Sequence, residues 1–374
     1  MTLTFTDEQE ELRASVRRFL ADKSPSEAVR RWMESDSGRD PALWAQMATQ
    51  LGLQGLALPE EQGGAGYGPV ELGIVLEEMG RALLPAPFLA SIALAGQALT
   101  ISGDEAACTR WLPGLADGSL TAALVVSEQG SSWNLDGIRT TAVVQGEGWL
   151  LNGTKTFVID GGTADLLLVA ARTDEGPGLF AVEGASADGV TCSALTVLDP
   201  TRRLAHVHLA DAAAVRVGPT GDASAYLREV LDLAIVALAA EQVGGAQACL
   251  DLSVEYAKIR VQFGRPIGSF QAIKHKCADM LLEVEAARSA VYHAASVAAE
   301  RSDDGELAIA AAVAGAYCAQ AYTHAAKETI QIHGGIGYTW EHDAHLHLKR
   351  AKSSELLLGA PAAHRSRLAE LVGI

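Results

Sequence analysis

Residues 148–159 read GWLLNGTKTFVI and residues 165–172 read DLLLVAAR. Both segments are short, rich in β-branched and aliphatic residues, and bounded by Gly, Asp or Asn, which is typical of strands separated by turns. Segments of the same kind recur from about residue 120 to residue 218. The middle third of the chain is therefore predicted to form a compact β-barrel or sandwich.

The chain on both sides of this β-rich segment has helical periodicity. Thr6 and Gln9 fit a capping box, and apolar residues follow them at helical spacing. Further helices are predicted near residues 41–52, 69–83, 87–101, 104–117, 221–258, 269–301, 305–333 and 341–355. The order α, β, α lacks the βαβ alternation of a doubly wound nucleotide-binding fold.

The predicted fold class is mainly α with a central β domain. Residues 1–118 are expected to form an N-terminal helical domain and residues 119–219 the central β domain. Residues 220–374 contain three long helical patterns and a shorter one, which predict a C-terminal four-helix bundle.

The composition is that of an ordinary globular protein. Of the 374 residues 49% are hydrophobic and 20% are charged, and the net charge of −17 opposes general binding to nucleic acid. The five cysteines are scattered and form no CxxC pair, so neither a disulfide framework nor a zinc site is expected. The N-terminus lacks a leader pattern and no uninterrupted apolar run approaches 18 residues, which predicts a cytoplasmic protein without membrane insertion.

Five segments carry a family resemblance. They are LPEEQGGAGYGP (58–69), SEQGSSWNLDGIRTTA (127–142), LNGTKTFVIDGGTADLLLVAAR (151–172), RVQFGRPIGSFQAIKHKCADM (260–280) and QIHGGIGYTWEH (331–342). In residues, order and spacing the chain resembles the acyl-CoA dehydrogenase family. The resemblance implies an N-terminal helical domain, a β-barrel or sandwich and a C-terminal four-helix bundle, assembled as a homo- or heterotetramer.

The resemblance also implies a cofactor, a reaction and a partner. The cofactor is FAD, and the reaction is α,β-dehydrogenation of an acyl-CoA thioester. A carboxylate takes the α-proton while the β-hydrogen leaves as hydride to flavin N5. An electron-transfer flavoprotein is the implied electron acceptor.

Flavin contacts are implied residue by residue. In the bundle, Arg260, Phe263, Gly264 and Gln271 match the segment that reaches the FAD of a neighbouring subunit, and Arg suits a pyrophosphate because its fork donates two hydrogen bonds. Gln331, Gly334 and Gly335 match the segment near the ADP half of FAD. Both segments are also consistent with plain helix ends.

In the β domain, Ser127 matches a hydroxyl residue that contacts the flavin ring, and Phe157, Val158 and Ile159 match the strand that covers it. For these three strand residues, alternating strand packing is the competing interpretation. The sequence departs from the family at Ile159, where a hydroxyl residue is usual, and at Trp133 and Asn134, where Ser and Asp are usual.

Both customary positions of the catalytic base lack a carboxylate. The position after the last helix of the bundle is Leu358, and the alternative position on the first long helix is Ala234. Glu241 stands in an apolar stretch two turns beyond Ala234, and a buried, unpartnered Glu there would have a raised pKa suited to a base. The competing interpretation is a Glu that lines the acyl pocket or pairs with a cation of the bundle.

Other candidate groups are weaker. Glu77, Glu78, Glu341 and Glu355 are expected to be solvated or salt-bridged. His342, His345 and His347 lack a fitting carboxylate frame, so no metal site is expected.

Three functions remain open at this stage. The first is a FAD-dependent acyl-CoA dehydrogenase with Glu241 as a relocated base. The second is a non-catalytic or half-site subunit that completes the FAD site of a heterotetrameric dehydrogenase. The third is a flavin oxidase on the same scaffold. The sequence does not identify the acyl chain, although Ala-rich helices are compatible with a branched, aryl or steroid-derived group.

Overall fold

The computed structural model describes residues 5–130, 133–300 and 305–374. The chain divides into two compact units, each of which is discontinuous in sequence. One unit contains Met1–Arg31, Gly73–Leu84 and Ile235–Ile374, and the other contains Trp32–Leu72 and Pro85–Ala234. We call them the bundle unit and the barrel unit. The three-domain division made from the sequence remains a prediction.

Seven strands of the barrel unit form one sheet. They are β1 (Ala122–Val125), β2 (Thr141–Gln145), β3 (Gly148–Ile159), β4 (Leu166–Thr173), β5 (Gly176–Val182), β6 (Val190–Ala194) and β7 (Leu204–Val217). The order is β1-β4-β2-β3-β7-β5, β6 pairs with β7, and β5 also pairs with β4. The pairings therefore close a ring through β4, β2, β3, β7 and β5, which makes a barrel rather than a sandwich.

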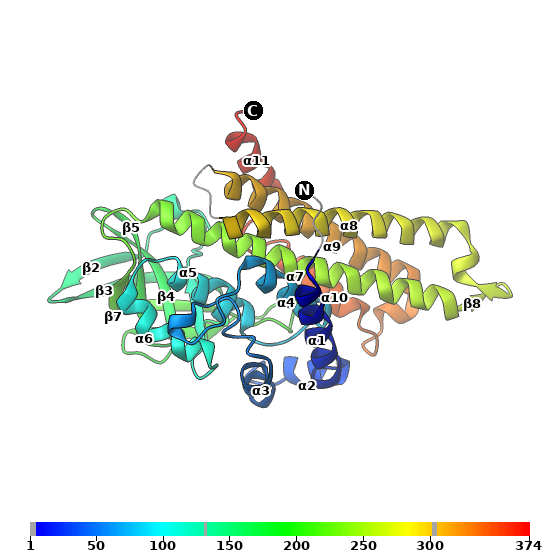
Figure 1. Cartoon of the computed structure of the whole chain (residues 1–374), viewed down its shortest axis with the longest axis horizontal. Helices are drawn as coiled ribbons and strands as arrows, with labels where there is room; N and C mark the ends of the chain where they lie inside the picture. Colours follow the sequence, from blue (N-terminus) through cyan, green and yellow to red (C-terminus); the bar gives the residue numbers. More distant parts are fainter. Residues whose placement is uncertain (1–4, 131–132, 301–304) are drawn as a thin grey trace. The chain divides into compact units, whose positions relative to one another are not determined.

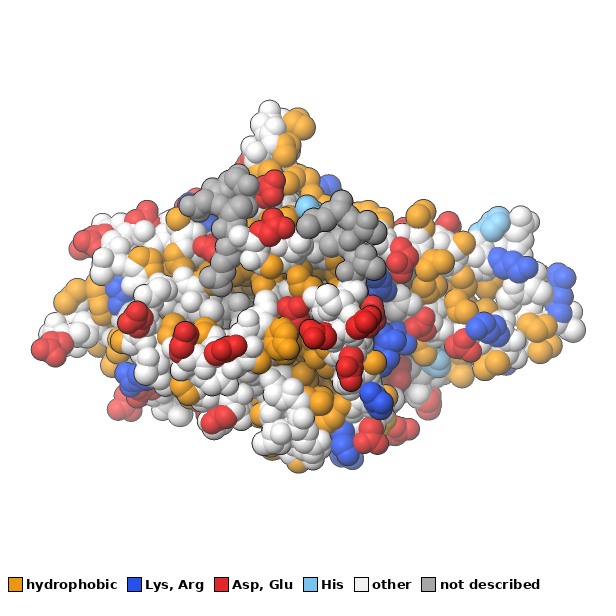
Figure 2. Space-filling model, viewed as in Figure 1, with side chains coloured by type: hydrophobic (Ala, Val, Ile, Leu, Met, Phe, Trp, Pro, Cys, Tyr) orange, Lys and Arg blue, Asp and Glu red, His pale blue; other side chains and the backbone are white. Residues whose placement is uncertain are grey.

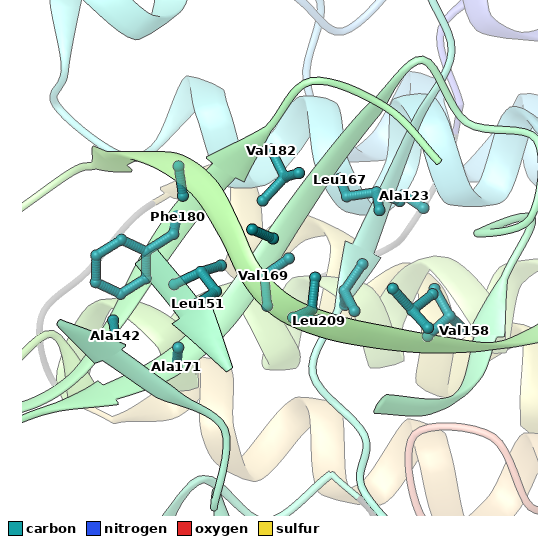
Figure 3. Packing of buried hydrophobic residues seen from close by; sticks show 14 of the residues in the cluster. Ala123, Ala142, Leu151, Val158, Leu167, Val169, Ala171, Phe180, Val182 and Leu209 are labelled. Atoms are coloured by element: carbon teal, nitrogen blue, oxygen red, sulfur yellow. The ribbon is translucent and has the colours of Figure 1, made fainter. Parts of the chain in front are cut away.

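The barrel core is built by alternate residues of these strands. Leu151, Val169, Phe180 and Leu209 lie on different strands and point toward one another (Figure 3). Burying alternate side chains of each strand on one face is what the period of two in these segments requires. The β-rich middle segment predicted from the sequence is confirmed.

Four helices of the barrel unit precede its strands in the sequence. They are α3 (Pro41–Leu51), a π-helix at Leu89–Gly96, α5 (Gln97–Thr100) and α6 (Glu105–Ala116). The π-helix reads LASIALAG and all of its residues are buried. Cys108 on α6 is buried, and the described residues hold all five cysteines as free thiols.

The bundle unit contains most of the long helices. They are α1 (Asp7–Lys23), α2 (Ser26–Met33, to Arg31 in this unit), α4 (Pro69–Arg81, from Gly73), α7 (Ser224–Ile259, from Ile235), α8 (Gln271–Glu300), α9 (Glu306–His333), α10 (Ala344–Ser354) and α11 (Pro361–Leu371). The Thr6 capping box at the start of α1 is confirmed. Residue 301, the predicted end of the helix that forms α8, lies outside the described residues.

The centre of the bundle is a shared apolar cluster. Leu250 of α7, Met280 of α8, Tyr322 of α9 and Ala351 of α10 all belong to it. Figure 1 shows α7, α8 and α9 as long helices that run alongside one another. Four helices therefore contribute to one core, as the sequence predicted.

Helix α7 is the one described helix that is long and apolar enough to cross a membrane. Its most apolar window is 89% buried inside the protein, as in the core helix of a globular domain, so this single helix is weak evidence for a membrane span.

Candidate active site

The barrel unit holds a buried hydroxyl without a partner. Ser127 follows β1, is 2% exposed, and its Oγ has no hydrogen-bond partner among the residues described. Its backbone oxygen accepts a hydrogen bond from the Thr156 N–H at 2.9 Å. An unsatisfied buried hydroxyl is costly, so a polar ligand atom beside it would be stabilising.

Phe157 lies in a local irregularity of β3. The pairing of β3 with β7 shifts register between Lys155 and Val158, and Phe157 has φ +55° with its side chain 51% exposed. A positive φ is strained for an aromatic residue and clusters at functional sites. The exposed ring fits a residue that covers a flat ligand.

Val158 and Ile159 are placed differently from Phe157. Both side chains are buried, and Val158 belongs to the barrel core. Strand packing, the competing interpretation from the sequence, thus describes these two side chains. Contacts from this part of β3 to a flavin would come from its backbone and from Phe157.

A buried ion pair lies beside these residues. Lys155 Nζ donates to Glu128 Oε1 at 2.8 Å, and both side chains are almost fully buried. Burial would raise the pKa of Glu128, but the hydrogen bond and charge of Lys155, together with Thr140, lower it from 4.5 to about 2. Burial lowers the pKa of Lys155 to about 8 against the opposing effect of Glu128. The sequence alone does not indicate this pair, although a Lys inside an apolar strand is a signal for a buried partner.

The pair predicts a pH dependence of stability. Because the pKa of Glu128 is lower in the folded chain than the ordinary 4.5, its stabilisation is present above pH 4.5 and is lost as the pH falls toward 2. Glu128→Gln should lower the free energy of unfolding by about 1–3 kcal/mol at pH 7, and this difference should shrink below pH 4.5. Urea unfolding of both proteins between pH 3 and 7 tests this. A difference that does not change with pH would contradict it.

In the bundle unit, the segment after α7 forms a small hairpin of β8 (Val261–Gln262) and β9 (Arg265–Pro266). Arg260 and Gln271 are exposed beside it, and Phe263 at its tip is 90% exposed with φ +51°. Residues 256–278 include five Lys or Arg residues and no acidic residue. Figure 2 shows basic side chains near the place of β8 in Figure 1, which is suited to a pyrophosphate.

The QIHGG segment ends α9 with an open backbone. Gln331 is exposed, and Gly334 has φ +61°. A Cβ placed on Gly334 or Gly335 would meet no atom within 4 Å among the described residues. This leaves space for a ligand to approach the backbone closely.

Each unit, considered by itself, has features that suit binding of part of a flavin nucleotide. The barrel unit offers the unpartnered Ser127 hydroxyl and the exposed Phe157 ring. The bundle unit offers Arg260 and the open glycine backbone.

Glu241 is paired, so the prediction of an unpartnered carboxylate is wrong. Arg350 Nη1 of α10 donates to Glu241 Oε1 at 2.8 Å, and the two side chains are 3% and 7% exposed respectively. The competing interpretation, pairing with a cation of the bundle, is confirmed. The partner was missed because it is 109 residues away on another helix.

The backbone around Glu241 is tightly packed as well. A Cβ on Gly80 of α4 would overlap the backbone oxygen of Glu241, and a Cβ on Gly244 would overlap that of Glu77. Two glycines thus let α4 and α7 approach closely at this level.

Leu358 and Ala234 are both buried apolar residues. Leu358 has φ +57° and lines a small cavity of about 10 Å³ together with Gly359 and His364. Neither of these side chains, at the two positions where the family resemblance places the base, can accept a proton.

The remaining acidic candidates are salt-bridged or exposed. Glu77 is buried and bound by Arg13, Arg288 and Tyr292, and Glu78 is bound by Arg17. Glu355 pairs with Lys352, whereas Glu341 is exposed.

The three histidines considered for a metal site, His342, His345 and His347, contact aromatic side chains. The ring of His342 lies 4.3 Å from that of His333, His345 stacks on Trp340, and His347 shares a hydrogen bond with Tyr322. No group of three or more His, Cys, Asp or Glu residues in the described part of the chain is placed to hold a metal ion.

Comparisons with known proteins agree over the length of the chain. The acyl-CoA dehydrogenase N-terminal domain matches residues 6–119, the middle domain matches residues 123–210 and the C-terminal domain matches residues 224–373. The chain is 36% identical over 363 residues to the acyl-CoA dehydrogenase IpdE2 of Mycolicibacterium smegmatis, with 97% of this chain and 98% of that protein covered.

Two solved structures are similar throughout. A variant of the Tcur3481–Tcur3483 steroid ACAD has a TM-score of 0.90 at 34% identity, with 98% of each chain covered. The ChsE4–ChsE5 complex from Mycobacterium tuberculosis has a TM-score of 0.91 at 30% identity, with 100% of this chain and 99% of that chain covered.

These matches make the protein an oxidoreductase of the flavoprotein class. More narrowly, the chain belongs to the acyl-CoA dehydrogenase family.

Proposed function

We propose that the chain is one subunit of a hetero-oligomeric, FAD-dependent acyl-CoA dehydrogenase, in which another chain supplies the catalytic carboxylate. One observation carries the proposal: the strongest candidate for a relocated base, Glu241, is held in a buried ion pair with Arg350. Apolar residues, Leu358 and Ala234, stand where the family resemblance places the base.

The pairing matters because a base must be free to accept a proton. Protonation of Glu241 would remove the negative charge that lies 2.8 Å from the buried guanidinium of Arg350, and weakening a buried ion pair in this way is unfavourable. A carboxylate in this setting stabilises the fold, and proton abstraction needs a group elsewhere.

The chain's own residues then serve the cofactor. A bound FAD would supply the hydride acceptor for the β-carbon of the thioester. Ser127 would donate its hydroxyl to the flavin ring, and Phe157 would cover the ring. Arg260 and the Gly334–Gly335 backbone would bind the phosphate-bearing half of a FAD.

The relatives support the assembly and suggest the substrate class. One similar structure is a complex of ChsE4 with ChsE5, and the other is a steroid ACAD of two components. We propose a bulky, ring-bearing acyl-CoA as substrate, in keeping with the small side chains at Ala234, Ala237 and Ala240 of α7. An electron-transfer flavoprotein is the proposed electron acceptor, as in the family at large.

Coexpression tests the proposal. The chain is produced alone and together with an acyl-CoA dehydrogenase chain of the same genome that retains a catalytic Glu. We expect stoichiometric FAD, and flavin bleaching on addition of a steroid-derived acyl-CoA without oxygen, only from the coexpressed pair. A lone chain that retains FAD and is bleached by the acyl-CoA would contradict the proposal and favour a base within this chain.

A further inference from the structure

The three residues that follow β1, residues 126–128, all form hydrogen bonds with Lys155 and Thr156 of β3. Lys155 Nζ donates to the Val126 oxygen at 3.1 Å and to Glu128 Oε1 at 2.8 Å. Between these two contacts, the Thr156 N–H donates to the Ser127 oxygen at 2.9 Å. Hydrogen bonds from β3 therefore fix Ser127 itself and the residue on each side of it.

Glu128 extends the same network to the residues before β2. Its Oε1 accepts from the Thr140 hydroxyl at 2.7 Å and from the Thr140 N–H at 3.0 Å. Its Oε2 accepts from the Arg139 N–H at 2.9 Å. Both carboxylate oxygens are occupied, so the charge of Lys155 is balanced and the carboxylate cannot rotate freely.

The network also borders the strained residue Phe157. The register of β3 against β7 shifts between Lys155 and Val158, so the regular hydrogen bonds of the strand pair are interrupted in this stretch. Phe157 nevertheless keeps a positive φ. A positive φ at such a residue persists only where the surrounding structure enforces it. Lys155 and Thr156, which directly precede Phe157, are hydrogen-bonded to the segment after β1 and so fix the backbone on this side of Phe157.

We propose that Lys155 and Glu128 are positioning residues of the flavin site, which fix the Ser127 hydroxyl and the Phe157 ring in the places they take against the isoalloxazine. This inference rests on the proposed function, because it requires that Ser127 and Phe157 contact the flavin. Unlike the Ser127 hydroxyl, both charged side chains have hydrogen-bond partners within the barrel unit, so the proposal gives neither of them a contact with the cofactor. They act through the backbone that they hold.

A flavin is a sensitive reporter of such positioning. Hydrogen bonds at the ring tune its reduction potential and its absorbance, and a donor displaced by a fraction of an ångström binds less well. A pair that only stabilised the barrel would change unfolding without changing these properties of the bound flavin.

The test uses the FAD-loaded protein, with its partner chain present if FAD requires it. Three variants are compared with wild type: Lys155→Met, the double variant Glu128→Gln/Lys155→Met, and Arg110→Met, which removes an exposed ion pair with Glu183 in the same unit. For each, the dissociation constant of FAD, the visible spectrum and the reduction potential of the flavin are measured beside urea unfolding.

We expect Lys155→Met to raise the dissociation constant of FAD roughly tenfold or more, and to shift the flavin spectrum and potential. The double variant removes the unpaired buried charge, so its stability should recover while its flavin properties stay altered. It also keeps the test valid if Lys155→Met does not fold. Arg110→Met should resemble wild type in every measurement.

Unchanged FAD affinity, spectrum and potential in the folded double variant would overturn the positioning role, and so would flavin properties that recover together with stability. A wild-type protein that binds no FAD, alone or with a partner chain, would instead overturn the proposed function.

Discussion

Replacing Arg350 by Met is expected to lower the free energy of unfolding by about 3–5 kcal/mol. The substitution removes the guanidinium that lies 2.8 Å from Glu241 Oε1, so the buried carboxylate loses the positive charge of Arg350. Because taking a lone charge out of water costs far more than burying a matched pair, the loss should be large. Urea unfolding at pH 7 measures it.

Two comparisons identify the cause. Glu241→Gln combined with Arg350→Met removes both charges, and this double variant should be more stable than Arg350→Met alone. Lys352→Met on the same helix removes a more exposed ion pair with Glu355 and should cost less than about 1 kcal/mol. Equal losses in Arg350→Met and Lys352→Met would contradict the account.

Glu77→Gln should have a comparable effect, about 3–5 kcal/mol, because Glu77 is the shared counter-charge of two guanidiniums. Arg13 Nη1 lies 2.8 Å from its Oε2, Arg288 pairs with its Oε1, and the Tyr292 hydroxyl donates to it as well. This network joins α1, α4 and α8 within the bundle unit. Thermal and urea unfolding at pH 7 measure the loss.

The matched control uses the same arginine. Glu285 lies 3.3 Å from Arg288 Nε but is 54% exposed, so Glu285→Gln should cost less than about 1 kcal/mol. Burial would raise the pKa of Glu77, but Arg288 and Arg13 lower it below 4.5. Its stabilisation is therefore present above pH 4.5 and lost as the pH falls further, so the gap between wild type and Glu77→Gln should narrow in acid. A difference in unfolding free energy between wild type and Glu77→Gln that grows as the pH falls would contradict the lowered pKa of Glu77.

Most elements of the fold could be predicted from local pattern. The capping box at Thr6 marked the start of α1, and the period of two in GWLLNGTKTFVI marked β3, because caps and periodicity are local consequences of backbone geometry. Helix α11 was missed although Pro361 at its first turn was a usable start signal. The π-helix at Leu89–Gly96 is buried all round, so no amphipathic period distinguished it from an α-helix.

The contacts of the candidate site could be predicted less well from local sequence pattern. Ion pairs such as Glu241–Arg350 and Glu128–Lys155 join residues on different elements, and their geometry depends on the register in which those elements pack. Glu241 looked isolated because its neighbours in sequence are apolar. Its charge was in fact balanced by a residue that only the folded bundle brings close.

The proposal that another chain supplies the catalytic base rests on the pairing of Glu241 with Arg350. The most direct measurement is an anaerobic titration of the FAD-loaded complex with acyl-CoA thioesters, following flavin bleaching near 450 nm in wild type and in Glu241→Gln. FAD content and unfolding are measured on both proteins. The account predicts that Glu241→Gln, wherever it is folded and retains FAD, is bleached as fully as wild type. Loss of bleaching in a folded, FAD-replete Glu241→Gln complex would contradict it and assign the base to Glu241.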